Sequence, residues 1–137
     1  TPAHWNWGRP DERWWAVRKT RQQRGAEAYQ TGLWAERLAL CLLMLKMYSI
    51  LGTRVKTAAG EVDILARRGR TLIIVEVKAR RSKAAAAEAL RPRQQVRLAR
   101  AAEILLARTQ TARTVRFDVV EITPYTFPRH RKDAWRP

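Results

Sequence analysis

The segment from Thr71 to Ala79, TLIIVEVKA, constrains the fold more than any other part of this chain, because it is the strongest strand signal. Side chains alternate along a strand, so one face carries isoleucine and valine while the other combines apolar residues with Glu76 and Lys78. This strand is also the most apolar one, and a charged pair inside it has a solvation cost. The presence of Glu76 and Lys78 therefore needs a structural or functional explanation.

A neighbouring strand is predicted from Glu61 to Arg67, where the side chains also alternate. Its two faces carry Val62, Ile64 and Ala66 on one side and Glu61, Asp63 and Leu65 on the other. Gly69, between Arg68 and Arg70, supplies the backbone freedom of a turn. The two strands are therefore predicted to form an antiparallel hairpin.

A helix is predicted before this hairpin, from Ala26 to about Leu51. The segment contains no proline, is rich in Ala and Leu, and keeps apolar residues at helical spacing. Gly52 is expected to end the helix, and Cys41 is expected to lie in the core. A short strand over residues 53–57 then leads into the hairpin.

A second helix is predicted after the hairpin, over residues 84–108. Its apolar residues fall within one arc of the helical wheel: Leu98, Ala101, Ala102 and Leu105. A third clear strand runs from Val115 to Ile122, in which Arg116 and Asp118 are expected to form a structural pair. The order of helix, hairpin, helix and strand predicts a single α/β domain, with a central mixed sheet flanked by helices.

The two ends of the chain lie outside this domain, which is predicted to span residues 25–123. Residues 1–24 form a Trp- and Arg-rich extension, whose tryptophans are expected to pack on the protein itself or on a neighbouring chain rather than to stack on bases. Residues 124–137 form a basic tail that is expected to be irregular. His4 and His130 lie in these two segments and support no site.

The charge of the chain indicates a polyanionic partner. The 137 residues include 28 Lys and Arg against 12 Asp and Glu, which gives a formal net charge of +16. Nucleic acid is the leading candidate, ahead of an anionic membrane surface or an acidic protein. The predicted nucleic-acid-binding residues are two arginines after the central strand and a stripe on the second helix: Arg80, Arg81, Arg93, Arg97 and Arg100. For Arg80 and Arg81, a solvated strand end is an equally good explanation.

The single cysteine excludes an internal disulfide, and the two distant histidines exclude a zinc-ligand cluster. The longest apolar run, Leu38 to Leu45, is far shorter than the ~20 residues that a membrane span needs. We therefore expect a cytoplasmic protein without a membrane span.

Asp63 and the pair Glu76-x-Lys78 are the residues with catalytic potential. If Asp63 faces the same side of the hairpin as Glu76, two carboxylates and one ammonium group converge. Closely spaced carboxylates repel each other, and a divalent cation such as Mg²⁺ relieves that repulsion and lowers the pKa of a bound water. Lys78 would then orient that water or help to deprotonate it. The alternative is a plain cross-strand salt bridge, and the residues alone leave both interpretations open.

Four motifs in this order resemble a known bacterial family: GxxxExxA from Gly32, GEVD from Gly60, VEVKxR from Val75 and RFDVV from Arg116. This is the YraN-like family, uncharacterised protein family 0102, which is similar in fold to the PD-(D/E)xK endonucleases and Holliday-junction resolvases. The resemblance implies a mixed sheet flanked by helices, Asp63 and Glu76 as metal ligands, and Lys78 as the catalytic lysine. It also implies that Glu36 is a helix carboxylate approaching the same metal centre. Gln94 stands where the family usually carries a lysine.

These features together predict a Mg²⁺-dependent, nuclease-like protein that acts on DNA. A non-catalytic nucleic-acid-binding module that retains the nuclease fold is the alternative. A basic protein that binds a membrane surface is a third candidate, and the absence of a long basic amphipathic helix argues against it. The sequence leaves the choice between DNA and RNA open. A resolvase-like role would need a homodimer, which the sequence also leaves open.

Overall fold

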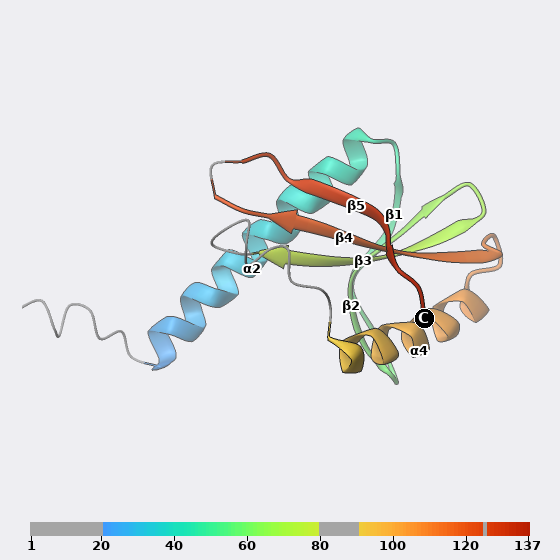
Figure 1. Cartoon of the computed structure of the whole chain (residues 1–137), viewed down its shortest axis with the longest axis horizontal. Helices are drawn as coiled ribbons and strands as arrows, with labels where there is room; N and C mark the ends of the chain where they lie inside the picture. The colour runs from blue at the N-terminus through green and yellow to red at the C-terminus, as the bar shows by residue number, and fades with distance from the viewer. Residues whose placement is uncertain (1–20, 80–90, 125) are drawn as a thin grey trace, which may run out of the picture. The chain divides into compact units, whose positions relative to one another are not determined.

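Figure 1 shows a computed structural model of the chain, which describes residues 21–79, 91–124 and 126–137, with side chains from residue 32 onward within these ranges. The chain divides into two compact units, Thr1–Gly32 and Leu33–Pro137, and every side chain discussed below belongs to the second. Most of the Trp-rich extension lies outside the described residues, as do His4, Arg80 and Arg81.

The described residues form two helices and five strands. In chain order these are α2 (Arg21–Leu45), β1 (Ser49–Thr57), β2 (Gly60–Arg68), β3 (Thr71–Ala79), α4 (Pro92–Arg108), β4 (Thr114–Ile122) and β5 (Arg129–Trp135). β3 has the predicted bounds, β2 extends one residue further at each end, and α4 ends where predicted. The first part of the predicted second helix, residues 84–90, lies outside the described residues.

The strands form one mixed sheet in the order β1-β2-β3-β4-β5. Neighbouring strands are antiparallel except for β3 and β4, which pair in parallel. A parallel pair needs a crossover connection, and α4 lies in the connection between these two strands. The predicted α/β fold with a central mixed sheet flanked by helices is therefore confirmed, and it is consistent with the nuclease-like architecture that the resemblance implies.

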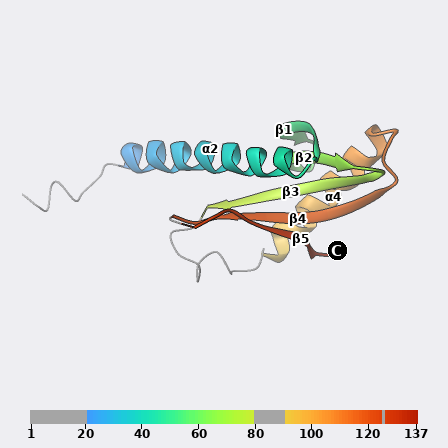
Figure 2. The same ribbon diagram turned by 90° about the horizontal axis from the view of Figure 1, so that it is seen from above.

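One helix covers each face of the sheet, as Figure 2 shows. On one face, α4 buries the predicted apolar arc, Leu98, Ala101, Ala102 and Leu105. On the other face, Ala39 and Leu43 of α2 pack against β2, β3 and β4. β3 contributes to both cores, with Leu72 and Ile74 on the α4 side and Ile73 and Val75 on the α2 side, so its predicted alternation is confirmed.

The first helix ends earlier than predicted, at Leu45 rather than at about Leu51. Met47 adopts a φ of 69°, and the N–H of Tyr48 donates to a carbonyl oxygen of the last helical turn at 3.0 Å. A left-handed residue of this kind ends a helix by satisfying its last carbonyl groups. The following residues then pair with β2, so strand pairing outweighs the helical spacing of their apolar side chains.

The prediction that Gly52 ends the helix is also wrong, because Gly52 lies inside β1. The pairing register of β1 with β2 shifts between Ile50 and Gly52, which is a β-bulge. A Cβ atom on Gly52 would lie 2.9 Å from Cγ2 of Val55, so the bulge leaves no room for a side chain without rearrangement.

Cys41 is exposed, so the prediction that it lies in the core is wrong. The buried face of α2 consists of Ala35, Ala39 and Leu43, which follow one another at intervals of four residues, and Cys41 lies off this line. Neither α2 nor any other helix within the described ranges has the length and apolar character needed to cross a membrane.

The prediction of an irregular C-terminal tail is wrong, because Arg129–Trp135 forms β5 and pairs antiparallel with β4 at the edge of the sheet. Its sequence, RHRKDAW, is highly charged, and charges on an edge strand protect it from pairing with other chains. The prediction depended on the prolines and basic residues of this segment, which do not exclude an edge strand. The strand also brings His130 into the interior, where the imidazole is 1% exposed.

Candidate functional site

The candidate site lies where β2 separates from β3. The ladder between the two strands runs from Arg68 and Thr71 to Ile64 and Val75. Beyond this point, the backbone N–H of Val77 donates to Oδ2 of Asp63 at 2.9 Å. A carboxylate thus satisfies a strand N–H that a neighbouring strand would otherwise satisfy. The end of the ladder holds the Asp63 side chain against β3.

The alternation of β2 is interrupted at the same position. Val62 and Leu65 belong to the core beneath α4, whereas Ile64 and Ala66 belong to the core beneath α2. The prediction that Val62 shares a face with Ile64 and Ala66 is therefore wrong. On β1, the residue between the partners of Val62 and Ile64 is Arg54, which has a φ of 48°. The irregularity on both strands coincides with the end of the β2–β3 ladder, where Asp63 lies.

Glu76 is 8% exposed and has two partners on the same oxygen. The Gln94 amide donates from Nε2 to Oε1 of Glu76 at 2.6 Å, and Nζ of Lys78 lies 3.6 Å from that oxygen. Lys78 also donates to Oε1 of Gln94 at 3.3 Å. Gln94 therefore bridges the carboxylate and the ammonium group of the predicted Glu76-x-Lys78 pair.

Asp63 contacts the backbone N–H of Val77, the residue after Glu76, so the two carboxylates are neighbours. Burial raises the pKa of Glu76, and the charge of Asp63 and a hydrogen bond shared with it raise the pKa further, to about 7 against an ordinary 4.5. The positive charges of Lys78 and Arg97 lower the pKa of Glu76 and offset part of this increase. The structure thus brings together Asp63, Glu76 and Lys78, as the hairpin predicts, and adds Gln94 from α4.

Glu36 has a different partner. Arg54 of β1 donates from Nε to both oxygens of the Glu36 carboxylate, at 3.0 and 3.3 Å. No three His, Cys, Asp or Glu side chains among the described residues are gathered closely enough to hold a metal ion. The assignment of Glu36 to the site of Asp63 and Glu76 stays a prediction.

Three of the predicted nucleic-acid-binding arginines, Arg93, Arg97 and Arg100, lie on α4, the helix that supplies Gln94. Together with the turn between β1 and β2, they border a depression of about 680 Å³, which we call the α4 hollow and which is lined in part by Ala58, Ala59, Arg93, Val96, Arg97 and Arg100. Arg97 follows Gln94 by three residues on the same side of α4, and Gln94 contacts Glu76, so this end of the hollow lies towards the carboxylates. The other two predicted arginines, Arg80 and Arg81, fall outside the described residues.

Gln94 is a site residue that sequence reasoning did not assign. In the resemblance to the YraN-like family, Gln94 is noted only because it stands where a lysine is usual. Its spacing contains the missing signal, because Gln94 precedes Leu98 by four residues and Ala101 by seven. It therefore shares the inward arc of α4, where a polar side chain needs a partner on the sheet.

Asp118 lies at the centre of a second polar cluster, on β4. Its fully buried carboxylate accepts hydrogen bonds from Arg116 at 2.8 and 2.7 Å and from the backbone N–H of Asp133 at 2.9 Å, and it lies 2.7 Å from Nε2 of His130. The predicted pairing of Arg116 with Asp118 is confirmed. Lys46 contacts the other ring nitrogen of His130 at 3.0 Å. With four contacts from three residues, the carboxylate has little capacity for a further ligand, so we regard this cluster as structural.

We expect this cluster to make the fold sensitive to acid. Burial alone would raise the pKa of Asp118, but the hydrogen bonds from His130, Arg116 and the backbone of Asp133 outweigh it and lower the pKa to about 2 from 3.8. The folded state therefore binds this proton less readily than the unfolded state, so the stabilisation is complete above about pH 4 and is lost as the pH falls towards about 2. Urea denaturation of the parent and of Asp118→Asn between pH 2 and 6 measures how the free energy of unfolding changes with pH. Parallel acid limbs for the two proteins would contradict the assignment.

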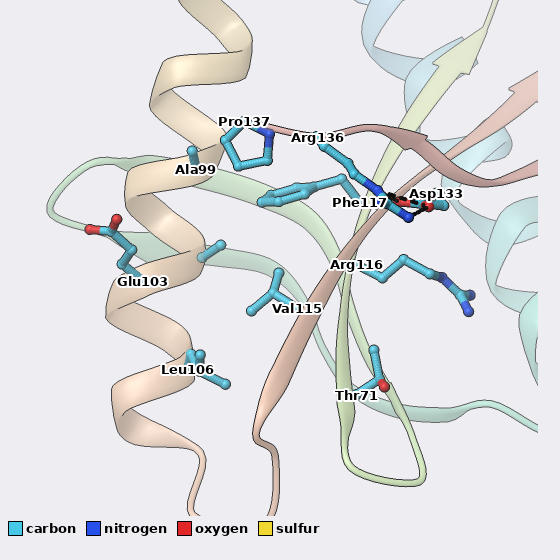
Figure 3. A pocket seen from close by; sticks show the side chains of 11 residues that line it. Thr71, Ala99, Glu103, Leu106, Val115, Arg116, Phe117, Asp133, Arg136 and Pro137 are labelled. Atoms are coloured by element: carbon cyan, nitrogen blue, oxygen red, sulfur yellow. Dashed lines mark hydrogen bonds and ion pairs between the residues drawn. The ribbon is translucent and has the colours of Figure 1, made fainter.

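A second depression, of about 570 Å³, lies between α4 and the ends of β4 and β5 (Figure 3). Val115 and Phe117 of β4 line it together with apolar residues of α4. Arg136 and Asp133, also in its lining, are engaged in an ion pair of 2.6 Å with each other. Of the predicted site residues that the structure describes, none lines this depression, so we place the candidate site at the end of the β2–β3 ladder.

Comparison with known proteins agrees with the resemblance seen in the motifs. Residues 35–122 match the family described as Uncharacterised protein family UPF0102. A UPF0102 protein of Parvibaculum lavamentivorans is 55% identical over 124 residues, covering 89% of this chain and 93% of the relative. Relatives from Maricaulis maris and Caulobacter vibrioides are each 45% identical, covering 86% and 84% of this chain and 93% and 94% of the relatives. This chain therefore belongs to the uncharacterised protein family UPF0102.

Proposed function

We propose that the protein binds nucleic acid and hydrolyses phosphodiester bonds of DNA with the help of Mg²⁺, using Asp63, Glu76 and Lys78. The observation that carries this proposal is the meeting of two carboxylates and an ammonium group at the end of the β2–β3 ladder, beside the arginines of α4. A structural salt bridge would need only one carboxylate for Lys78. The second carboxylate, held against β3 by a backbone N–H, suits the binding of a cation.

The donor atoms of the site fit Mg²⁺. This ion prefers carboxylate oxygens and completes its shell with water and substrate phosphate, so two protein carboxylates are a sufficient protein contribution. Asp63 and Glu76 would hold it. When bound, Mg²⁺ polarises a phosphoryl oxygen and lowers the pKa of a coordinated water.

The remaining residues prepare the substrate and the attacking water. Lys78 lies beside Glu76 and offers its ammonium group to a phosphoryl oxygen or to the water. Gln94 holds Oε1 of Glu76 and limits direct pairing of Lys78 with that oxygen. The arginines of the α4 hollow neutralise neighbouring phosphates, which favours binding that is strong at low salt and largely independent of sequence.

Incubation of the purified full chain with end-labelled single-stranded, duplex and branched DNA, in Mg²⁺ and in EDTA, tests the proposal. We expect cleavage of at least one substrate in Mg²⁺ and none in EDTA. The proposal fails if no substrate is cleaved in Mg²⁺ or in Mn²⁺, which occupies similar oxygen sites.

A second candidate is a nucleic-acid-binding module without catalytic turnover. The observation that favours it is the internal satisfaction of the cluster, since Lys78 and Gln94 both contact the same oxygen of Glu76. This candidate predicts DNA binding that is unchanged by EDTA and by Asp63→Asn, together with no cleavage in the assay above.

We expect Gln94→Ala to weaken Mg²⁺ binding by about tenfold, because residues that orient metal ligands typically contribute about 10- to 100-fold to affinity. Without the amide, Lys78 moves from 3.6 Å into a closer ion pair with Glu76 and competes with the cation. Titration calorimetry on nucleic-acid-free protein measures the change, with Gln110→Ala, an exposed position beyond α4, as the control. Equal affinities for the parent and Gln94→Ala would show that Gln94 does not orient the ligand.

A further inference from the structure

The α4 hollow combines charge with an apolar surface. Arg93, Arg97 and Arg100 line it together with one carboxylate, Glu103, so the lining favours an anionic ligand. Between the arginines, Val96 is 53% exposed, and Ile104 and two alanines of the β1–β2 turn add further apolar surface. A surface that contacted only phosphate would need the arginines but not these apolar residues.

The turn between β1 and β2 forms a fixed wall of this hollow. The hydroxyl of Thr57 donates to the carbonyl of Gly60 at 2.7 Å and accepts from the backbone N–H groups of Ala59 and Gly60, each at 3.1 Å. Gly60 has a φ of 140°, and a Cβ atom there would lie 2.7 Å from Cδ of Arg97. The absence of a side chain at Gly60 therefore lets Arg97 lie across the turn.

We infer that the α4 hollow binds unpaired nucleotides of the strand whose phosphodiester enters the Asp63–Glu76 site. The substrate class is then single-stranded DNA, or a single-stranded flap or gap next to a duplex. This inference deepens the proposed function and rests on it for the position of the scissile bond.

The chemistry of the lining supports unpaired nucleotides over a duplex. In a duplex the faces of the bases are stacked on each other, so the outer surface offers phosphates, sugars and only the edges of the bases. An unpaired nucleotide also exposes an apolar base face, which stacks on guanidinium groups and packs against aliphatic side chains. The volume of about 680 Å³ falls within the roughly 300 to 1,000 Å³ of small-ligand pockets.

Fluorescence anisotropy with the parent chain in EDTA tests this inference without cleavage. The probes are a labelled single-stranded DNA 12-mer, the same sequence as a duplex, a 12-mer with abasic sites, and an RNA 12-mer, all at matched salt. We expect the single strand to bind at least about tenfold more tightly than the duplex, and the abasic strand to lose most of this preference, because base stacking carries it. Equal binding of RNA would extend the substrate class to any single strand.

Two variants separate the apolar contribution from the charge. Val96→Ser is expected to weaken single-strand binding about three- to tenfold without changing duplex binding, because it removes only apolar contact. Arg97→Ala is expected to lower the slope of log affinity against log salt by about 0.7 for a single strand, the value for one phosphate contact. Arg113→Ala, which removes an equal charge outside the hollow, is the control.

The inference is overturned if the duplex binds as tightly as the single strand, if abasic sites have no effect, or if no probe binds. Its failure is distinguishable from failure of the proposed hydrolysis. Preferential single-strand binding without cleavage would leave the hollow assigned and remove the catalytic proposal. Cleavage together with tighter binding of the duplex would support the catalytic proposal and remove the assignment of the hollow.

Discussion

Glu76→Gln and Asp63→Asn are each expected to reduce metal-dependent DNA cleavage by about 10³-fold or more, because each removes one of the two negative charges that would hold the cation. Both substitutions preserve the shape of the side chain. The amide introduced by Glu76→Gln would still present an oxygen to Gln94, and the amide introduced by Asp63→Asn would still accept from the N–H of Val77. The loss would therefore report on charge rather than on disruption of the strand ends. Initial rates on the best substrate from the cleavage assay provide the measurement.

The stability of Glu76→Gln distinguishes a functional carboxylate from a structural one. The pKa of Glu76 in the folded state, about 7, lies above its ordinary 4.5, so ionisation of this group weakens the fold as the pH rises through this interval. We therefore expect Glu76→Gln to unfold at an equal or higher temperature than the parent above pH 7. Glu61→Gln, at an exposed position of the same hairpin, is the control and should cleave like the parent. Full activity in both site variants would refute the catalytic assignment.

Asp118→Ala is expected to lower the free energy of unfolding by about 3 to 5 kcal/mol, the typical effect of removing one partner from a buried charged pair. The substitution would leave Arg116 and the buried His130 without their common acceptor, and it would remove the contact that ties the end of β5 to β4. Urea denaturation at pH 7 provides the free energy.

Two further variants make this second prediction specific. Asp118→Asn retains a hydrogen-bond acceptor and should be less destabilising than the alanine variant. Asp133→Asn affects an exposed ion pair with Arg136 and should leave the stability unchanged. A small effect of Asp118→Ala, similar to that of Asp133→Asn, would show that the cluster does not hold the sheet edge together.

The parts of the fold that the sequence predicts correctly are those in which local pattern and final environment agree. β3 is buried on both faces, so its apolar run and its alternation both survive in the structure. The hairpin of β2 and β3 follows from the turn at Gly69, which has the expected positive φ of 60°. Because adjacent strands place their residues side by side, the meeting of Asp63 with Glu76 was predictable as well.

The features that sequence reasoning misses depend on partners distant in the chain. Ile50 keeps the helical spacing of the apolar residues before it, but Ser49 and Ile50 pair with β2 once the chain reverses. β5 is polar enough to resemble a tail, and its order comes from β4 and from the Asp118 cluster. Gln94 resembles a substituted phosphate contact until the crossover of α4 places it over Glu76. In each case the determining contact joins segments that no local pattern connects.

Under the proposed function, the hydroxyl of Thr57 has a consequence for the kinetics of nucleic-acid binding. It ties down the tip of the β1–β2 hairpin with one donated and two accepted hydrogen bonds, so this wall of the hollow is already in its final shape before a ligand arrives. Preorganised surfaces avoid the entropy loss of ordering a loop on binding. Encounter would then be limited by diffusion in the field of a chain with a charge of +16, and the association rate should depend more steeply on ionic strength than the dissociation rate does.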